Sequence, residues 1–292
     1  MGTVTRLHPR SANASPTSLT TLADSYRLGL EAQNKSPRTI QTYLEAITRL
    51  DTFLAAEGRP REIDRLGRED IEAFIAEVLR TQSPATASNR YRALQSFFGW
   101  AIEEEEIERS PMARMKPPKV PEKPVPILRE ADKRALLKAC EGRDFADLRD
   151  GAIIRLLLDT GMRREELARL AVDDLDLRDK SVRVVGKGGK LRDCTFGLRT
   201  ARAIDRYLRR ARPKHPHADA DVLWLGHAGP MTGNGIYQAV LRRAEQAGVE
   251  GISPHTFRHS WAHDLKASGM QDPELMHLAG WSSAQMPQRY GA

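Results

Sequence analysis

Cysteines and long apolar runs are scarce in this chain of 292 residues. The two cysteines, Cys140 and Cys194, have no Cys or His neighbour at ligand spacing, which argues against a disulfide scaffold or a zinc site and favours a reducing, cytoplasmic environment. No apolar run approaches the roughly 18 residues that a membrane span requires, so no membrane segment is expected. Residues 1–17 lack the apolar stretch of a secretory signal, and we expect them to form a flexible arm.

Positive charge exceeds negative charge, with 46 Lys and Arg residues against 39 Asp and Glu residues and a formal net charge of +7. The excess is concentrated, because residues 1–127 have a net charge of +1 and residues 128–292 one of +6. With 40% hydrophobic residues, the chain is too apolar for disorder and long enough for one or two domains with real cores. We therefore expect a folded protein whose second half contacts a polyanion.

The clearest domain boundary is a stretch from Ser110 to Pro126 that contains six prolines and four basic residues. Proline at this density prevents helix formation and favours an extended, semi-rigid connector. The sequence thus predicts a flexible arm over residues 1–17, a helical domain over 18–110, a Pro/Lys-rich linker over 111–127 and a second domain over 128–292.

Periodic apolar positions predict four helices in the first domain. In the second of them, Ile40, Leu44 and Ile47 begin a stripe at three- and four-residue spacing that suits the core of a helical bundle. Ser36 and Ser83 are each followed by proline, which is the pattern of an N-cap and a first helical residue. The predicted helices span Leu19–Ala32, Pro37–Glu57, Arg68–Leu79 and Ala85–Glu106.

The second domain is predicted to combine helices with a small antiparallel sheet. Three short segments, 175–177, 181–185 and 191–196, are rich in strand-forming residues and separated by turn signals. Helices are predicted at 130–140, 148–159, 199–211, 232–247 and 254–267, with shorter ones after residue 273. The fold class is therefore mainly α with a small antiparallel β-sheet.

Two glycine-containing motifs carry basic groups that suit phosphate chemistry. In Thr160–Leu167, Arg163 follows a glycine turn at the start of a helix, where backbone N–H groups favour an anion and the guanidinium adds a bidentate fork. Glu166 could hold that fork, although an Arg with a nearby Glu is more commonly a surface ion pair. The segment Gly186–Lys190 is followed by Leu and a strand, so it is not a phosphate-binding loop of a nucleotide hydrolase. It is a hairpin tip that directs a lysine towards a substrate, or else an exposed basic turn.

Two further motifs lie nearer the end of the chain. Ser253 and Pro254 start a helix that places His255 and Arg258 on neighbouring faces of its first turn. His255 and His259 could share a metal ion, but the sequence offers no third ligand. Further on, Trp281 precedes Tyr290 by nine residues, although a tyrosine so near a terminus is usually only part of the surface.

Taken together, the order and spacing of these motifs resemble the tyrosine recombinase (phage integrase) family over residues 18–290. Thr160–Leu167 resembles the first arginine box of that family, Gly186–Lys190 its hairpin lysine and His255-x-x-Arg258 its second box. Gly280-Trp281 and Tyr290 resemble the third box and the nucleophile. The first domain is similar to the helical core-binding domain of the family, including Phe97-Phe98-Gly99-Trp100. The resemblance implies that the second domain is a mixed α/β catalytic domain.

Three features depart from the common family pattern. Trp281 stands where most members have histidine; its indole N–H still donates a hydrogen bond but cannot transfer a proton. Glu165 occupies a position that is usually small, and we expect it to alter the packing beside Arg163. Only Gly291 and Ala292 follow Tyr290, so we expect the tail that many relatives insert into a neighbouring subunit to be absent or formed differently.

The resemblance implies a site-specific recombinase that cuts and rejoins DNA through a 3′-phosphotyrosyl intermediate at Tyr290, without ATP, metal or another cofactor. The family positions imply that His255 is the base and Lys187 the acid, and that Arg163, Arg258 and Trp281 stabilise the transition state. Glu166 would support Arg163. The implied partners are double-stranded DNA with two recombination sites, further copies of the chain in a tetramer, and accessory DNA-bending factors.

Two other functions remain alternatives at this point. The chain could be a noncatalytic, sequence-specific DNA-binding regulator on the same fold. It could also be a relaxing enzyme similar to type IB topoisomerases, which share the tyrosine chemistry.

Overall fold

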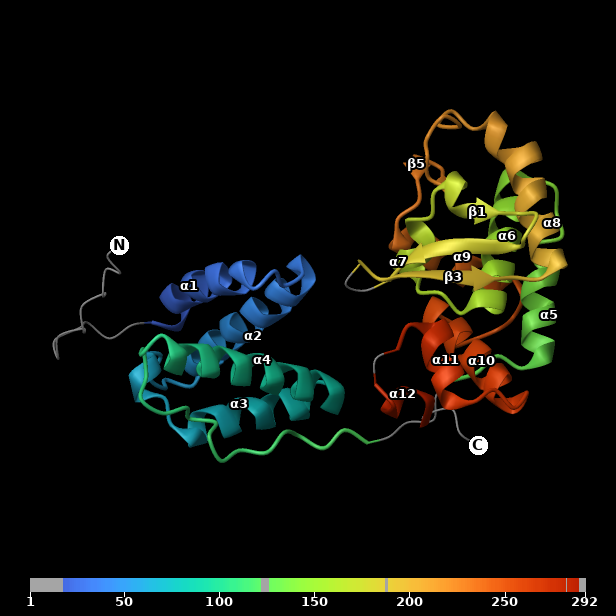
Figure 1. Cartoon of the computed structure of the whole chain (residues 1–292). Helices are drawn as coiled ribbons and strands as arrows, with labels where there is room; N and C mark the ends of the chain where they lie inside the picture. The colour runs from blue at the N-terminus through green and yellow to red at the C-terminus, as the bar shows by residue number, and fades with distance from the viewer. Residues whose placement is uncertain (1–17, 122–125, 187–188, 282, 289–292) are drawn as a thin grey trace, which may run out of the picture. The chain divides into compact units, whose positions relative to one another are not determined.

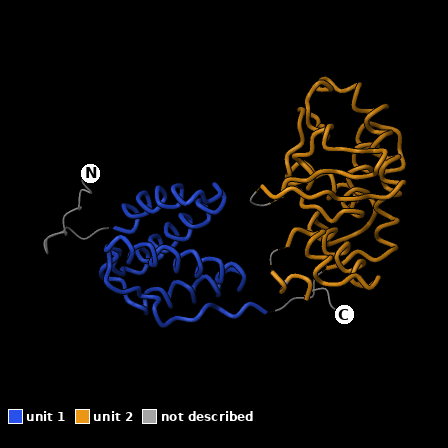
Figure 2. Tube along the Cα trace, viewed as in Figure 1, with its two compact units in different colours: residues 1–123 blue, residues 124–292 orange. Residues whose placement is uncertain are grey.

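The chain divides into two units at a boundary between residues 123 and 124, within the proline-rich stretch (Figure 2). The structure, a computed structural model, describes residues 18–121, 126–186, 189–281 and 283–288. Helices predominate in both units, and the strands are short and antiparallel (Figure 1). This agrees with the predicted fold class. None of the helices in the described ranges has the length and apolar character to cross a membrane.

Over residues 18–121 the first unit contains four α-helices, and serine hydroxyls cap three of them. Ser18, Ser36 and Ser83 accept hydrogen bonds from the backbone N–H three residues later at 3.2 Å, which satisfies one of the otherwise unpaired N–H groups of each helix. Proline occupies the first helical position after Ser36 and Ser83, as predicted. The helices are α1 (Leu19–Ala32), α2 (Pro37–Ala56), α3 (Arg68–Thr81) and α4 (Pro84–Glu103).

Helix α4 ends at Glu103, three residues before the predicted end at Glu106. Glu104 caps the helix, and Glu105 adopts a left-handed conformation with φ of 59°. Four consecutive glutamates at a helix C-terminus repel one another and the negative end of the helix dipole. The prediction of a longer helix was therefore wrong for an electrostatic reason.

Aromatic side chains fill the core of the first unit. Tyr26 packs edge-on against Phe97 with ring centroids 5.4 Å apart, lies 5.2 Å from Trp100, and donates a hydrogen bond to Ser96. Burial raises the pKa of Tyr26 to about 12. These contacts lock α1 onto α4.

The first residues of the predicted linker pack on this unit. Met112 is buried, and Tyr91 of α4 donates a hydrogen bond of 2.8 Å to the carbonyl of Met115. The start of the predicted linker is thus held on the first unit as far as residue 115.

The second unit combines a three-stranded antiparallel sheet with helices. Its strands are β1 (Leu175–Asp176), β2 (Ser181–Val185) and β3 (Leu191–Thr195), in that spatial order. Its helices are α5 (Glu130–Lys138), α6 (Phe145–Thr160), α7 (Arg164–Ala168), α8 (Leu198–Arg206), α9 (Gly233–Gln246), α10 (Pro254–Ala267), α11 (Asp272–Ala279) and α12 (Gln285–Gln288). A second hairpin, β4 (Leu225–Gly226) with β5 (Gly229–Pro230), was not predicted, because two-residue strands leave no alternating pattern.

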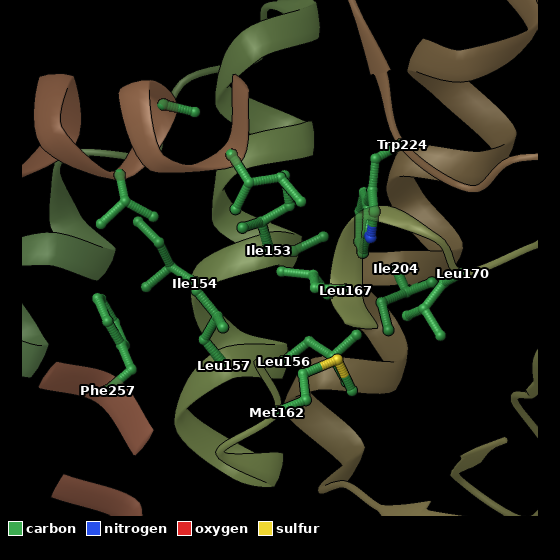
Figure 3. Packing of buried hydrophobic residues seen from close by; sticks show 14 of the residues in the cluster. Ile153, Ile154, Leu156, Leu157, Met162, Leu167, Leu170, Ile204, Trp224 and Phe257 are labelled. Atoms are coloured by element: carbon green, nitrogen blue, oxygen red, sulfur yellow. The ribbon is translucent and has the colours of Figure 1, made fainter. Parts of the chain in front are cut away.

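Helix α6 forms the centre of the second unit and packs against α8, α9 and α10. Figure 3 shows its side chains, among them Ile153, Leu156 and Leu157, with Phe257 of α10 on one side and Ile204 of α8 on the other. Such burial contributes about 1.5–3 kcal/mol for each large apolar side chain. The elements on either side of α6 are therefore held in fixed positions relative to it.

A separate, smaller cluster joins the helices at the end of the chain. Trp261 and Ala262 of α10 pack with Leu275 and Ala279 of α11 and with Trp281 beyond it. The last described part of the chain is thus anchored through α10.

Gly161 ends α6 and cannot be replaced without cost. Its φ is 56°, in the left-handed region that favours glycine, and a Cβ atom here would lie 2.4 Å from the ring of Trp261. The turn that leads from α6 to Arg163 therefore requires this glycine.

We expect Gly161→Ala to destabilise the chain by about 2–5 kcal/mol, since backbone strain and overpacking both act there. Gly248→Ala is the matched control, because Gly248 has φ of 66° but no atom within 4 Å of a Cβ. The control should cost only about 1–2 kcal/mol. Urea unfolding of both variants measures the difference, and equal losses would contradict the close approach of Trp261.

Candidate active site

Five of the seven predicted site residues lie in the described part of the chain, and all five are in the second unit. Three elements carry them: the turn from α6 into α7, the start of α10, and the segment after α11. They are Arg163, Glu166, His255, Arg258 and Trp281. Lys187 and Tyr290 lie outside the described residues.

Arg163 is the N-cap residue of α7, and Glu166 closes the turn. The Glu166 carboxylate accepts hydrogen bonds of 2.8 Å from the Arg163 backbone N–H and from its guanidinium Nη1. The Arg163 side chain is 37% exposed, whereas that of Glu166 is only 6% exposed. Glu166 thus holds Arg163 from inside the protein while the guanidinium stays accessible to an anion.

A second arginine, which the sequence analysis did not select, binds the same carboxylate. Arg192 of β3 donates from Nη2 to Oε2 of Glu166 at 2.6 Å and from Nη1 to Oε1 at 3.0 Å. The alternation of β3 could have revealed it, because Arg192 lies two residues before the buried Cys194 and so on the inward side of the strand. Its register partner Val184 is also buried.

Burial alone would raise the pKa of Glu166, but its hydrogen bonds with Arg192 and Arg163 outweigh that effect and leave the pKa below the ordinary value. The carboxylate is therefore ionised at neutral pH. A buried anion between two guanidinium groups forms a short charged chain from β3 to α7.

Arg258 is buried and joins two helix ends. Its Nη1 donates to the carbonyl of Gly161 at 2.8 Å, and its Nη2 donates to the carbonyl of Ala279 at 2.6 Å. These carbonyls lie at the C-termini of α6 and α11, where the helix dipoles are negative. The buried positive charge is thus compensated by backbone oxygens, and the first and third sequence boxes meet at it.

His255, on the first turn of α10, lies within the electrostatic influence of both arginines. Partial desolvation, followed by the positive charges of Arg258 and Arg163, lowers its pKa below the ordinary value of 6.5. The ring of His259 packs against it edge-on at 4.3 Å. Neutral imidazole is therefore the main form at pH 7, as a proton acceptor requires.

No group of three metal-ligating side chains occurs near His255 and His259, or elsewhere, in the ranges that the structure describes. The metal alternative for this histidine pair therefore has no support among those residues.

Trp281 is buried directly after Gly280, which ends α11 with φ of 63°. The Arg258 guanidinium carbon lies 5.2 Å from the centre of the Trp281 ring. A Cβ atom on Gly280 would lie 3.6 Å from Nη1 of Arg192. The third box therefore packs against both arginines that come from β3 and α10.

The Glu165 side chain contacts its neighbour Arg164 and the start of α9. Its carboxylate pairs with Arg164 at 3.2 Å, and a Cβ atom on Gly233 of α9 would lie 2.4 Å from it. Its close packing is thus with the start of α9, where glycine provides the room.

Removal of the Arg163 charge should raise the pKa of His255, because that charge disfavours the imidazolium ion. We expect the His255 ring resonance of Arg163→Ala to titrate at higher pH than that of the unmodified chain, measured by NMR. Arg164→Ala is the control and should leave the titration unchanged. An Arg163→Ala titration identical to that of the control would show that Arg163 does not act on His255.

The lowered pKa of His255 also affects stability. Because His255 binds a proton more readily in the unfolded chain than in the folded one, it should reduce the free energy of unfolding as the pH falls below about 6.5.

Comparison with known proteins places both units in one family. The second unit matches the phage integrase family over residues 126–292, and the first matches the phage integrase N-terminal SAM-like domain over residues 22–108. The tyrosine recombinase XerD of Corynebacterium glutamicum is 31% identical over 266 residues, which cover 87% of each chain. XerC of Bacillus subtilis is 29% identical over 267 residues, or 88% of this chain and 86% of the relative.

Solved structures share the fold. The XerH site-specific recombinase bound to a palindromic difH substrate, in a post-cleavage complex, aligns with a TM-score of 0.75 at 19% identity and covers 93% of this chain and 80% of that one. With this fold and these sequence matches, the chain belongs to the phage integrase family of tyrosine recombinases, enzymes that cleave and rejoin DNA strands.

Proposed function

We propose that this protein is a site-specific DNA recombinase that uses Tyr290 as its nucleophile. The observation that supports the proposal most directly is the hydrogen bond from Arg258, three residues after His255 on α10, to the carbonyl of Gly161, two residues before Arg163. The Arg163 guanidinium is accessible, that of Arg258 is buried between two helix ends, and His255 lies on the first turn of the helix that carries Arg258. Two positive groups and a proton acceptor at one place suit the charge that develops on a phosphorus centre.

The reaction proceeds by in-line displacement. The Tyr290 hydroxyl attacks the scissile phosphorus and loses its proton to His255, while the bond to the 5′ oxygen breaks and Lys187 protonates that oxygen. The products are a 3′-phosphotyrosyl ester and a free 5′ hydroxyl. A 5′ hydroxyl from the other duplex then attacks the ester, and the proton transfers reverse. Since each step exchanges one phosphodiester for another, the reaction needs no ATP, and guanidinium groups supply the charge compensation instead of a metal.

Tyrosine needs this assistance. A phenol with a pKa of about 10 is about 4 kcal/mol short of full ionisation at pH 7. A preorganised donor contributes about 3–4 kcal/mol to such a transition state. Arg163, Arg258 and the Trp281 indole are the proposed donors, and Glu166 keeps Arg163 in place.

The proposed substrates are two double-stranded recombination sites, which the XerH complex with difH also suggests. The proposed assembly is a tetramer on the two duplexes, with accessory DNA-bending factors as further partners. We place the reaction in the cytoplasm, where the two buried, unpaired cysteines, Cys140 and Cys194, stay reduced.

Incubation with nicked duplexes taken from the DNA that flanks the gene tests the reaction, because a nick near the cleavage point prevents religation. We expect a covalent protein–DNA species on denaturing electrophoresis. Tyr290→Phe should abolish it, whereas Tyr43→Phe, which removes a hydroxyl from the first unit, should not. A covalent species that persists in Tyr290→Phe would contradict the proposed nucleophile.

The same purified protein distinguishes a recombinase from the two alternative functions. Exchange of strands only between particular sites supports a recombinase, while relaxation of any supercoiled plasmid without exchange would indicate a topoisomerase-like enzyme. DNA binding with no cleavage under any condition would indicate a regulator.

Binding to DNA should depend strongly on salt. If the protein neutralises six to ten phosphates, its affinity should fall by roughly 10³–10⁵ between 50 and 200 mM salt. Fluorescence anisotropy with a labelled duplex measures the slope of log affinity against log salt. A slope near zero would contradict binding through phosphate contacts.

A further inference from the structure

The buried carboxylate of Glu166 lies between two arginines that differ in their exposure. Arg192 donates to both of its oxygens and is 10% exposed, whereas Arg163 donates to Oε1 and is 37% exposed. We propose that Arg192 is a positioning residue that neutralises Glu166, so that Glu166 can orient Arg163 without cancelling the charge that Arg163 offers to the scissile phosphate. The inference rests on the proposed function of Arg163.

The charges at the carboxylate make this role necessary. Glu166 alone with Arg163 would be a neutral pair, and a neutral pair attracts a phosphate far less than a free guanidinium does. With the guanidinium of Arg192 added, the net charge of Arg163, Glu166 and Arg192 together is +1. Because the carboxylate is buried, solvent cannot supply this compensation, and another side chain must do so.

The geometry fits Arg192 to the neutralisation of Glu166 and Arg163 to the binding of a ligand. The fork of Arg192 matches both carboxylate oxygens at 2.6 and 3.0 Å, which is the bidentate arrangement that binds a carboxylate most firmly. Arg163 contributes one guanidinium contact and its backbone N–H to the same group. The more strongly held arginine is thus the one turned inward, and the accessible one keeps donors for a ligand.

The Arg192 guanidinium is enclosed by protein atoms. Cβ atoms added to Gly186 and Gly280 would lie 3.2 and 3.6 Å from its Nη1, and the thiol of Cys194 contacts it from the same strand. The two glycines leave room for the guanidinium between the β2–β3 hairpin and the third box. Both of its terminal nitrogens donate to Glu166, so the proposed effect of Arg192 on the reaction passes through Glu166.

A set of variants tests the charge argument by the rate of covalent complex formation. We expect Arg192→Gln to slow this step by about 10–100-fold, a loss of the size seen when the hydrogen-bond partner of a metal-binding residue is removed. Glu166→Gln in the same chain should restore part of the rate, because Arg163 is then no longer neutralised. A double variant faster than Arg192→Gln supports the proposal, and losses that multiply would overturn it.

Matched variants separate charge from folding. Arg192→Lys keeps the charge but loses the fork, so it should be less impaired than Arg192→Gln; equal impairment would overturn the proposal. Arg183→Gln is the control, because Arg183 lies on the neighbouring strand and forms an exposed ion pair with Asp193 at 3.2 Å. The control should react at the unmodified rate, and urea unfolding of each variant verifies that it is folded.

Substrate chemistry gives a readout that a merely structural role would not change. A methylphosphonate at the cleavage point lacks one negative charge, so the defect of Arg192→Gln should shrink several-fold on it. A 5′-thiolate leaving group needs no protonation and should leave the defect unchanged. Rescue by the thiolate alone would place Arg192 in leaving-group chemistry and overturn the proposal.

Sulfate binding keeps this test independent of the proposed function. The shift of the His255 resonance on titration with sulfate reports an anion beside Arg163. We expect the affinity for sulfate to be about tenfold weaker in Arg192→Gln, because one positive charge is lost near a partly exposed site. The double variant with Glu166→Gln should recover this affinity. If the unmodified chain forms no covalent complex, the proposed function fails, but the sulfate series still decides on Arg192. Equal sulfate affinity in all variants would overturn the inference.

Discussion

The guanidinium of Arg258 is the interaction on which the arrangement of the site depends. It links the C-terminal carbonyls of α6 and α11, which are more than a hundred residues apart in the chain. A buried cation without partners would cost several kcal/mol, yet two helix ends offer it both hydrogen-bond acceptors and negative dipoles. Since Arg163 follows one of these helices and Trp281 the other, one side chain sets the distance between the first and third sequence boxes.

Two glycines allow the first and third sequence boxes to lie close together at Arg258. Gly161 and Gly280 both adopt left-handed conformations that end a helix, and both lie against large side chains, the Trp261 ring in one case and Arg192 in the other. A Cβ atom at Gly161 would clash with an aromatic ring that cannot move aside. In both motifs a glycine therefore makes a sharp turn that is followed within two residues by a candidate site residue, Arg163 in one case and Trp281 in the other.

Much of this could be predicted from the sequence where the signal is local. Ser36 and Ser83, each followed by proline, predict where helices start. Arg163, His255 and Trp281 occur in motifs short enough to be recognised. The end of α4 was missed because repulsion among Glu103–Glu106 competes with helix periodicity. The two-residue strands β4 and β5 carry too few residues for any pattern.

Arg192 shows the limit of such reasoning most clearly. Its inward position follows from the alternation of β3, but its partner Glu166 is 26 residues away and belongs to a different element. Likewise, that Arg258 binds two backbone carbonyls depends on how α6 and α11 approach α10, which only tertiary packing decides. Motifs thus identify candidate site residues, and the fold determines which of them are held, shielded or exposed.

The small cluster around Trp261, Leu275 and Trp281 is distinct from the large core centred on α6. Cooperative units with few apolar contacts open at lower free energy than the main body of a protein. The amides of α11 should therefore exchange with solvent before those of α6. An opening confined to this end would withdraw Trp281 from Arg258 while the remainder stays folded. With the proposed role of Trp281, heat or denaturant would then abolish activity before global unfolding.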